Sequence, residues 1–487
     1  MKHLNIILSA FVLIGALPSF GQSILSVSPG LGTLNDAIDG DTLANGERVD
    51  PQRIYEVQDG GFYGLVRTIE NDGYDLHIRL AAGSEERAIL QPIAGDGGEA
   101  SRAFEARGNM ILEGLEVLNV DQIGVLQERM IRLRVDDIKV TVDNCLMQID
   151  DQTAFRADEN NGSIFITNSI FANIGQGNDP DDGRFIDDRG NDLDSLVIEN
   201  SIVYNITSRF LRDGGGTIDY AFVNQNTFVN SSQRGFDFGI VREMTFTNNL
   251  VVNGSFEGID EPEEPGLPSE GFVTVDEWLP DPPAQSLTIT NNNTFTESAL
   301  TDLYPDGLIP VPLFDSTAVL LNATIADNIS EPLTFTDGPA APTQYLQDFF
   351  DDNIPNSATW WDDDSDFPFF PTYDFSYSTS FDSYTGGTDG QPIGALQDFS
   401  LSTTERNSIE FGLYPIPAQD QLFVDIPEKA DINVIRVFNI LGAEVASFPA
   451  NNAGLQILDI TNLKSGLYII SLVQADGNMS SKKFVVD

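Results

Sequence analysis

Arginines recur at fixed positions of a repeat in the first half of this chain, and side chains at this spacing could act together in binding or catalysis. A six-residue phrase holds them, at 102–107, 129–134, 153–158, 184–189, 209–214 and 234–239. Its copies read RAFEAR, RMIRLR, TAFRAD, RFIDDR, RFLRDG and RGFDFG. A planar guanidinium binds carboxylate or sulfate groups through paired hydrogen bonds. A row of these side chains could therefore bind an acidic chain molecule.

The same groups could also cleave a bound uronate chain by β-elimination. This reaction needs a base for the proton beside the carboxylate and a positive group that stabilises the enolate-like state. The predicted catalytic residues are Arg156, Arg189, Arg209, Arg212, Asp187 and Asp213, and the predicted substrate-binding residues are Arg132, Arg134, Arg184 and Arg234. Asp187 and Asp188 are the predicted metal ligands, and Ca²⁺ is the cofactor that the sequence suggests, although the acids around them miss the spacing of a calcium-binding loop.

Three other interpretations of these residues stay open. Arginines and aspartates on one sheet could satisfy each other as surface ion pairs, which individually contribute little. The protein could bind a glycan without cleaving it, as an adhesion protein at the cell surface, with Trp278, Trp360 and Trp361 either stacking on sugars or packing in a cover. It could also be an inverting glycoside hydrolase, which needs two carboxyl groups about 6.5–9.5 Å apart.

A second repeat identifies the elements that must position these groups. Alternating apolar residues, a polar turn residue and another apolar pair recur in ILEGLEVLNV, VTVDNCLMQI, IFITNSIFANI and LVIENSIVYNI, with weaker copies up to residue 298. Period-two alternation indicates strands, and asparagine tolerates the left-handed backbone of a sharp bend. The predicted turn residues are Gly114, Asn144, Asn168, Asn200, Asn226, Asn248 and Asn291. This pattern predicts an all-β fold, a right-handed parallel β-helix.

Stacking of the coils determines how the arginine phrase is presented. Its third position, always apolar, is predicted to face the core, and its fourth and sixth positions are predicted to face outward. Strict alternation would turn the first position inward, so we expect a corner there. Neighbouring coils lie about 4.8 Å apart, and 12 of the 25 basic residues fall between Arg102 and Arg234. The sequence thus predicts a basic strip on one sheet of the solenoid.

Composition and local patterns divide the chain and exclude several classes. Residues 1–22 have the pattern of a secretory signal peptide, and 23–397 form the β-helix domain with an acidic and aromatic cover. A linker at 398–411 precedes a small β-sandwich at 412–487. The net charge of −50 argues against nucleic-acid binding, and a single cysteine, Cys145, excludes an intramolecular disulfide framework. We expect a monomer without a transmembrane anchor, because no later stretch is long and apolar enough to span a bilayer.

The C-terminal module carries several separate motifs. These are Tyr414-Pro415, the phrases VFNILGAEV and LKSGLYIISL, and the basic close Lys482-Lys483-Phe484, with strands predicted at 421–426, 432–438, 456–460, 467–473 and 482–486. On these motifs the module resembles the type A C-terminal sorting domain of the type IX secretion system, found in the Bacteroidetes. The resemblance implies the type IX machinery as a partner. It also implies periplasmic export, translocation across the outer membrane, and a secreted or surface-attached protein.

The solenoid resembles the polysaccharide lyases of the chondroitinase B and alginate lyase type, in architecture and in its repeated phrases. That resemblance implies a lyase-like protein that cleaves an anionic polysaccharide, with uronate or sulfate groups, by β-elimination. One departure concerns the base. Those enzymes use a lysine beside an arginine, whereas Lys139 is the only lysine between residues 23 and 428. The predicted chemistry therefore depends on arginines.

Overall fold

The computed structural model describes residues 23–93, 102–121, 124–176, 180–262, 270–276, 285–314, 323–354, 359–361, 373–396, 411–426, 432–439, 444–450, 454–474 and 479–486. The predicted signal peptide at 1–22, Trp278 and the predicted linker at 398–411, except Phe411, lie outside the described residues. Within these described ranges, no helix combines the length and the apolar character that crossing a bilayer requires.

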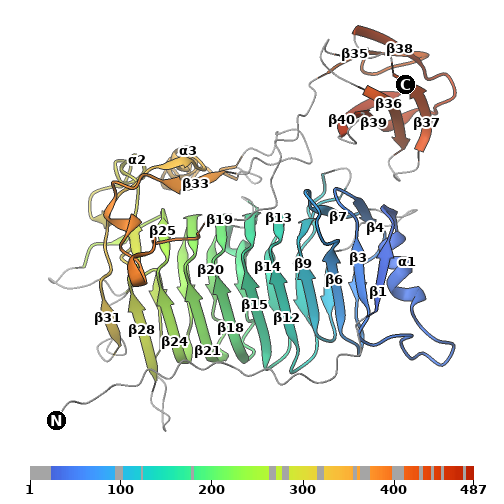
Figure 1. The fold of residues 1–487 in the computed structure, drawn as a ribbon. Helices are drawn as coiled ribbons and strands as arrows, with labels where there is room; N and C mark the ends of the chain where they lie inside the picture. Colours follow the sequence, from blue (N-terminus) through green and yellow to red (C-terminus); the bar gives the residue numbers. More distant parts are fainter. Residues whose placement is uncertain are drawn as a thin grey trace, which may run out of the picture.

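The N-terminal part of the described chain is a parallel β-helix with sheets A, B and C, which confirms the predicted architecture (Figure 1). Sheet A contains β1 (Ile24–Val27), β3 (Ile54–Val57), β6 (Leu76–Leu80), β9 (Met110–Glu113), β12 (Lys139–Asp143), β15 (Gly162–Thr167), β18 (Leu193–Glu199), β21 (Thr217–Asn224), β24 (Ile240–Thr247), β28 (Ser286–Thr290) and β31 (Thr324–Ala326). Sheet B contains β2 (Gly30–Leu31), β4 (Phe62–Leu65), β7 (Ala88–Pro92), β10 (Leu115–Leu118), β13 (Leu146–Asp150), β16 (Ile170–Ile174), β19 (Ile202–Ile206), β22 (Thr227–Ser231), β25 (Leu250–Val252) and β29 (Asn293–Phe295). Sheet C contains β5 (Ile69–Glu70), β8 (Phe104–Ala106), β11 (Ile131–Leu133), β14 (Thr153–Ala157), β17 (Arg184–Asp187), β20 (Arg209–Arg212), β23 (Arg234–Asp237) and β27 (Val273–Thr274).

The turn between sheets A and B uses a left-handed residue in coil after coil. Gly114, Asn144, Asn168, Asn200, Asn248 and Asn291 all have positive φ, as the repeat predicts. The prediction is wrong at Asn226, because Gln225 is the left-handed residue there, with φ 59°. Asn226 lies one position later and is fully buried, where its side chain donates to the carbonyl of Ile198 at 2.9 Å. A side-chain ladder also forms, since Nδ2 of Asn200 donates to Oδ1 of Asn168 at 2.8 Å.

The interior of the solenoid is a stack of apolar side chains from the three sheets. The third positions of the arginine phrase are fully buried there, and these residues are Phe104, Ile131, Phe155, Ile186, Leu211 and Phe236. They pair strand to strand in register, as Phe155 with Ile186 and Leu211 with Phe236. A fully buried side chain of this size contributes about 2 kcal/mol. Helix α1 (Thr33–Gly40) packs against β1, β2 and β4 and buries Leu34 and Ile38 in the same core.

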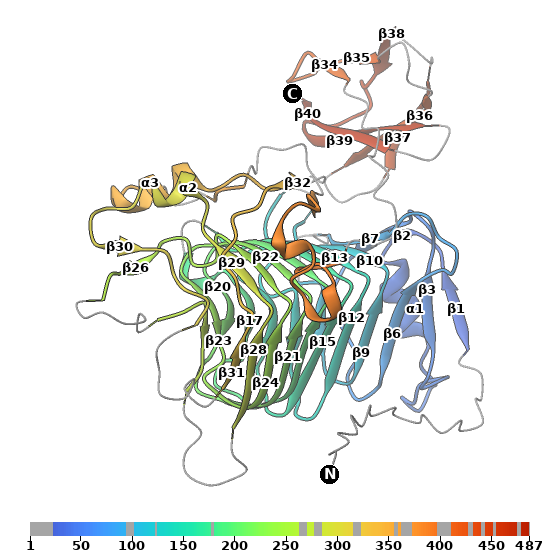
Figure 2. The same ribbon diagram turned by 60° about the vertical axis from the view of Figure 1, so that its left-hand side comes forward.

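A cover, residues 329–354 and 373–396 of the described chain, packs on the outer side of sheet B (Figure 2). It contains β32 (Phe335–Asp337), α3 (Thr343–Phe350) and β33 (Asp374–Tyr377), and α2 (Ser298–Thr301) lies against α3. Phe375 packs against Tyr204 with ring centroids 5.4 Å apart, and the Leu396 amide donates to Asn200 at 2.8 Å. The short strands β26 (Ile259–Asp260) and β30 (Leu308–Ile309) pair antiparallel beside it. The predicted cover therefore lies along sheet B.

Trp360 belongs to this packing and not to an exposed sugar platform. Its ring lies 5.0 Å from that of Phe256, and its Nε1 donates to Oδ1 of Asn205 at 3.0 Å. Trp361 lies beside it, with ring centroids 5.3 Å apart. These contacts favour the packing interpretation of both tryptophans.

The C-terminal module is antiparallel. One sheet contains β34 (Gly412–Tyr414), β35 (Gln421–Ile426) and β38 (Gly454–Asp459), and the other contains β36 (Ile432–Asn439), β37 (Glu444–Pro449), β39 (Gly466–Gln474) and β40 (Met479–Val486). Leu422, Val424, Ile435 and Ile470 are fully buried between them. The five strands predicted from the sequence are present, the first with the predicted ends and the other four with shifted ends, and β34 and β37 are additional.

Candidate functional site

The outward column of sheet C combines acidic and basic side chains. The fourth positions of the phrase stack in register as Glu105, Arg132, Arg156, Asp187 and Arg212, on β8, β11, β14, β17 and β20. Strand pairing thus brings these residues into one line, as the sequence predicts. The arginines along this line differ in their ion-pair partners.

The first position of the phrase is a corner. The second and third positions, such as Phe185 and Ile186, are both fully buried, so the chain bends before them. The first-position side chain then reaches the outer face, where Arg184 contacts Asp187 at 3.2 Å. Arg102 contacts Glu105 in the same way at 3.3 Å. The first and fourth positions therefore form one polar surface.

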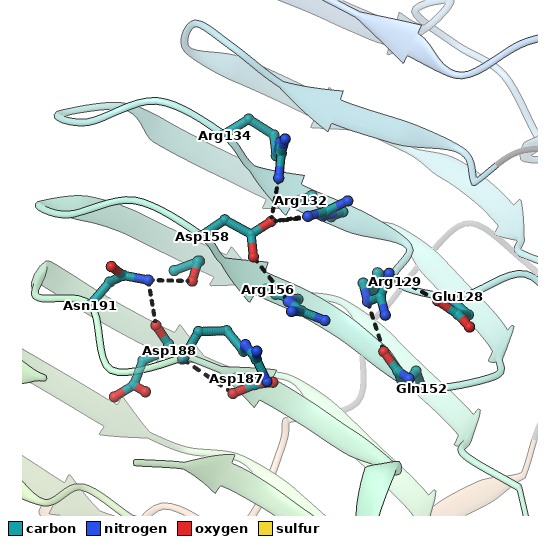
Figure 3. A network of polar contacts seen from close by, with 12 residues as sticks. Glu128, Arg129, Arg132, Arg134, Gln152, Arg156, Asp158, Asp187, Asp188 and Asn191 are labelled. Carbon is teal, nitrogen blue, oxygen red and sulfur yellow. Dashed lines mark hydrogen bonds and ion pairs between the residues drawn. The ribbon is translucent and has the colours of Figure 1, made fainter. Parts of the chain in front are cut away.

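We call the polar groups of β8, β11 and β14, with the residues directly before and after these strands, the closed half of this surface, and they are Arg102, Glu105, Arg107, Arg129, Arg132, Arg134, Arg156 and Asp158. Figure 3 shows Arg129, Arg132, Arg134, Arg156 and Asp158. Asp158 accepts from Arg132 Nε at 2.7 Å, Arg134 Nη1 at 3.2 Å and Arg156 Nε at 3.0 Å. Arg134 also contacts Glu105 at 3.3 Å. Although burial acts to raise it, these arginines hold the pKa of Asp158 below its usual range.

We call the arginines of the next coils the open half: Arg184, Arg189, Arg209, Arg212 and Arg234. Arg184, Arg209 and Arg234 stack in register. Arg184 is the exception within this half, because its side chain is only 10% exposed and contacts Asp182 at 2.6 Å and Asp187 at 3.2 Å. The side chain of Arg212 is 30% exposed and contacts Asp187 at 3.2 Å, and that of Arg234 is 51% exposed with Asp237 at 3.9 Å.

Arg209 is the least satisfied arginine of the open half. No described carboxylate lies within ion-pair distance of it, and its Nε reaches only Oγ of Ser208, at 3.4 Å. Burial lowers the pKa of Arg209, and the neighbouring guanidinium groups of Arg234, Arg184 and Arg212 act in the same direction, against Asp237. A bound anion would relieve this repulsion. Arg189 lies at an exposed turn, where its amide donates to Asp187 at 3.2 Å and its side chain has no described ion pair.

The aspartates of β17 face opposite ways. Asp187 is fully buried beneath Arg184 and Arg212, with contacts of 3.2 Å to each. Asp188 accepts from the amides of Gly190 at 2.8 Å and Gly214 at 2.6 Å. Burial raises the pKa of Asp188 to about 7, and burial also raises that of Asp213 in the next coil.

These contacts bear on the predicted metal site. Asp187 already binds two guanidinium groups, and Asp188 is directed to the turn. The described part of the chain contains no group of three or more acidic, histidine or cysteine side chains arranged for a metal ion. Calcium binding stays a prediction.

The structure separates the predicted site residues into two groups. Arg132, Arg134 and Arg156 lie in the closed half, bound to Asp158, whereas Arg209, Arg212 and Arg234 lie in the open half. Lys139 is on sheet A, with Nζ 3.9 Å from the centre of the Phe165 ring, so it cannot join either group. Sequence reasoning missed Glu257 and Tyr345, which lie beside the open half and carry no repeat signal.

Comparison with known proteins identifies the C-terminal module. Residues 412–487 match the family described as the secretion system C-terminal sorting domain. This confirms the resemblance seen in the sequence, and the protein is one that is exported to the cell surface or secreted.

One further similarity concerns a lyase. The ulvan lyase NLR42 of Nonlabens ulvanivorans is 25% identical over 104 residues, which are 21% of this chain and 19% of that protein. The matched stretch spans about a fifth of the relative's length, so it covers only a small part of either protein.

Proposed function

We propose that this exported protein acts on an acidic polysaccharide at the open half of sheet C, as a lyase that cleaves a uronate-containing or sulfated chain by β-elimination. The observation that carries the proposal is Arg209, stacked between Arg184 and Arg234 without a described carboxylate partner. Arginines one strand spacing apart, about 4.8 Å, suit a polymer with repeated acid groups.

The elimination assigns separate roles to these groups. The guanidinium of Arg209 would neutralise the uronate carboxylate, which makes the proton on the adjacent carbon more acidic. Asp213, a predicted catalytic residue, would act as the base and take up that proton. The electrons of the carbon–hydrogen bond then form a carbon–carbon double bond while the glycosidic carbon–oxygen bond breaks, and the protonated base would return the proton to the departing oxygen. Arg212 and Arg234 would hold the flanking acid groups. The sequence similarity to an ulvan lyase supports a glycan lyase, although it is short.

A glycan-binding protein without catalytic activity is the second candidate. The observation that favours it is the position of Lys139 on sheet A, because no lysine then accompanies the arginines of sheet C. We do not favour hydrolysis, because Asp187 is bound by two arginines and Asp188 is directed to the turn.

The test is a panel of alginate, pectate, chondroitin sulfate and ulvan, with the full mature chain. Absorbance of unsaturated products reports cleavage, and retardation in glycan-containing native gels reports binding. We expect Arg209→Ala to weaken retention about tenfold, the loss of one charge-assisted contact. Arg134→Ala, in the closed half, is the matched control and should keep wild-type retention. Retention without product would select the binding protein, and no interaction with any acidic glycan would refute both candidates.

A further inference from the structure

A cluster of polar groups lies where the cover meets the solenoid, with Tyr345 buried, Glu257 partly buried and Asp181 exposed. Tyr345 of α3 packs on Phe256 and Trp360, with ring centroids 6.1 and 4.9 Å away. The next residue after Phe256 is Glu257, whose amide donates to the carbonyl of Ser232 at 2.9 Å. Burial raises the pKa of Glu257 to about 7, and Asp181 adds to this effect. An acidic side chain thus lies under an aromatic cover.

The hydroxyl group of Tyr345 is the unexplained feature of this cluster. Tyr345 is only 4% exposed, and its hydroxyl has no hydrogen-bond partner among the residues that the structure describes. Glu257 and Asp181 both raise the pKa of Tyr345 after burial, so the carboxyl groups lie near it without binding it. Buried polar groups normally have partners, because an unpaired one costs folding free energy. An unpaired buried hydroxyl therefore calls for an explanation, and a hydrogen bond to a ligand is one that the neighbouring carboxyl groups support.

The cluster is joined to the open half by a chain of hydrogen bonds. Nε2 of Gln233 donates to Oδ1 of Asp181, and Oγ of Ser208 donates to Oε1 of Gln233 at 3.0 Å. Nε of Arg209 in turn donates to Oγ of Ser208 at 3.4 Å. The polar groups under α3 therefore continue the surface that ends at Arg209.

The two carboxyl groups and the phenol of this cluster indicate what kind of group it would bind. Two carboxyl groups repel a uronate or a sulfate, but they accept a hydrogen bond from a hydroxyl. The phenol of Tyr345 can donate to the same hydroxyl, since one oxygen both donates and accepts. We propose that Glu257, Asp181 and Tyr345 form a subsite for a sugar hydroxyl of the unit next to the one whose acid group binds Arg209. The subsite rests on the proposed function, and α3 must shift for a sugar to reach it.

The test compares two tyrosines of the same cluster. Tyr304 donates its hydroxyl to the carbonyl of Phe256 at 2.8 Å, whereas that of Tyr345 is unpaired. Tyr345→Phe should raise Tm by about 1–2 °C, because an unpaired buried hydroxyl is removed. It should also weaken retention on the acidic glycan that binds the wild type, by about tenfold. Tyr304→Phe should lower Tm and leave retention unchanged.

The possible results distinguish a failure of the subsite from a failure of the proposed function. Wild-type retention by Tyr345→Phe would overturn the subsite while the glycan function stands, since Arg209→Ala still reports on that function. A fall in Tm for Tyr345→Phe would also overturn it, because the hydroxyl would then have a structural partner. Failure of the wild-type protein to bind any acidic glycan would overturn the function and the subsite together.

Discussion

In the closed half of sheet C, Asp158 binds three arginines, whereas in the open half Arg209 binds no described carboxylate. The same phrase builds both halves, and its sixth position differs between them. That position holds Arg107, Arg134 and Asp158 in the closed half, but Arg189 after β17 and Gly214 and Gly239 after β20 and β23, so only the closed half has an acid there. A Cβ on Gly214 would lie 2.2 Å from the amide nitrogen of Gly190, so an acidic side chain cannot be accommodated there. The comparison teaches that an arginine of this phrase is held in an ion-pair network where a sixth-position acid reaches it, as Asp158 does, and is available where the sixth position is glycine.

The largest expected effect is a loss of stability when Asp158, the central acid of the closed half, is replaced. Asp158→Asn leaves Arg132, Arg134 and Arg156 facing one another with little carboxylate to offset their charge. Removing one partner from such a largely buried network should lower the free energy of unfolding by about 4 kcal/mol. Chemical denaturation of the mature chain measures this, with the exposed neighbour Glu159→Gln as the control. Glycan retention should stay unchanged, and a loss of retention without a loss of stability would reverse the roles of the two halves.

The alignment of the fourth positions into one column could be predicted from the sequence. The division of that column into a closed and an open half could not. Apolar third positions such as Phe155 and Ile186 must enter the core, and this requirement aligns every fourth position. Asparagine indicated the turns because it tolerates positive φ, but Gln225 adopts the same backbone without that signature. Which arginine meets which acid depends on side-chain conformations between coils. The contact of Tyr345 with Phe256 joins segments far apart in the chain, which no local pattern encodes.

The second effect is an opposite pH dependence of two acids, Asp158 in the closed half and Asp188 in the turn beside the open half. The lowered pKa of Asp158 means that its contribution is present above the unfolded value and lost as pH falls through the folded one. The pKa of Asp188, raised to about 7, means that its contribution is present below the unfolded value and lost as pH rises through about 7. Asp188→Asn should therefore raise stability at pH 8, on the order of 3 kcal/mol, and have little effect near pH 4.

The contribution of Asp188 is obtained as the difference in stability between Asp188→Asn and the wild type at each pH. Burial also raises the pKa of Asp150 and Glu257 to about 7, so the wild-type curve of stability against pH contains their contributions as well. Denaturation at pH 4, 6 and 8 gives the two curves. Parallel curves would mean that Asp188 is already ionised at every pH tested, and the proposed contrast between the halves would lose its electrostatic basis.

The smallest expected effect is the difference in stability and glycan retention between alanine variants of two arginines in the same column. Arg156 and Arg212 both lie opposite Asp187 on neighbouring strands, and their side chains are 14% and 30% exposed. Arg156→Ala should lower the free energy of unfolding by about 1 kcal/mol, because its ion pair with Asp158 is partly buried, and should keep glycan retention. Arg212→Ala should lower stability less, since Arg184 still binds Asp187, but weaken retention by a factor of about three to ten. Equal loss of retention in both variants would extend the binding surface into the closed half, and the sixth-position glycines would then no longer explain where the glycan binds.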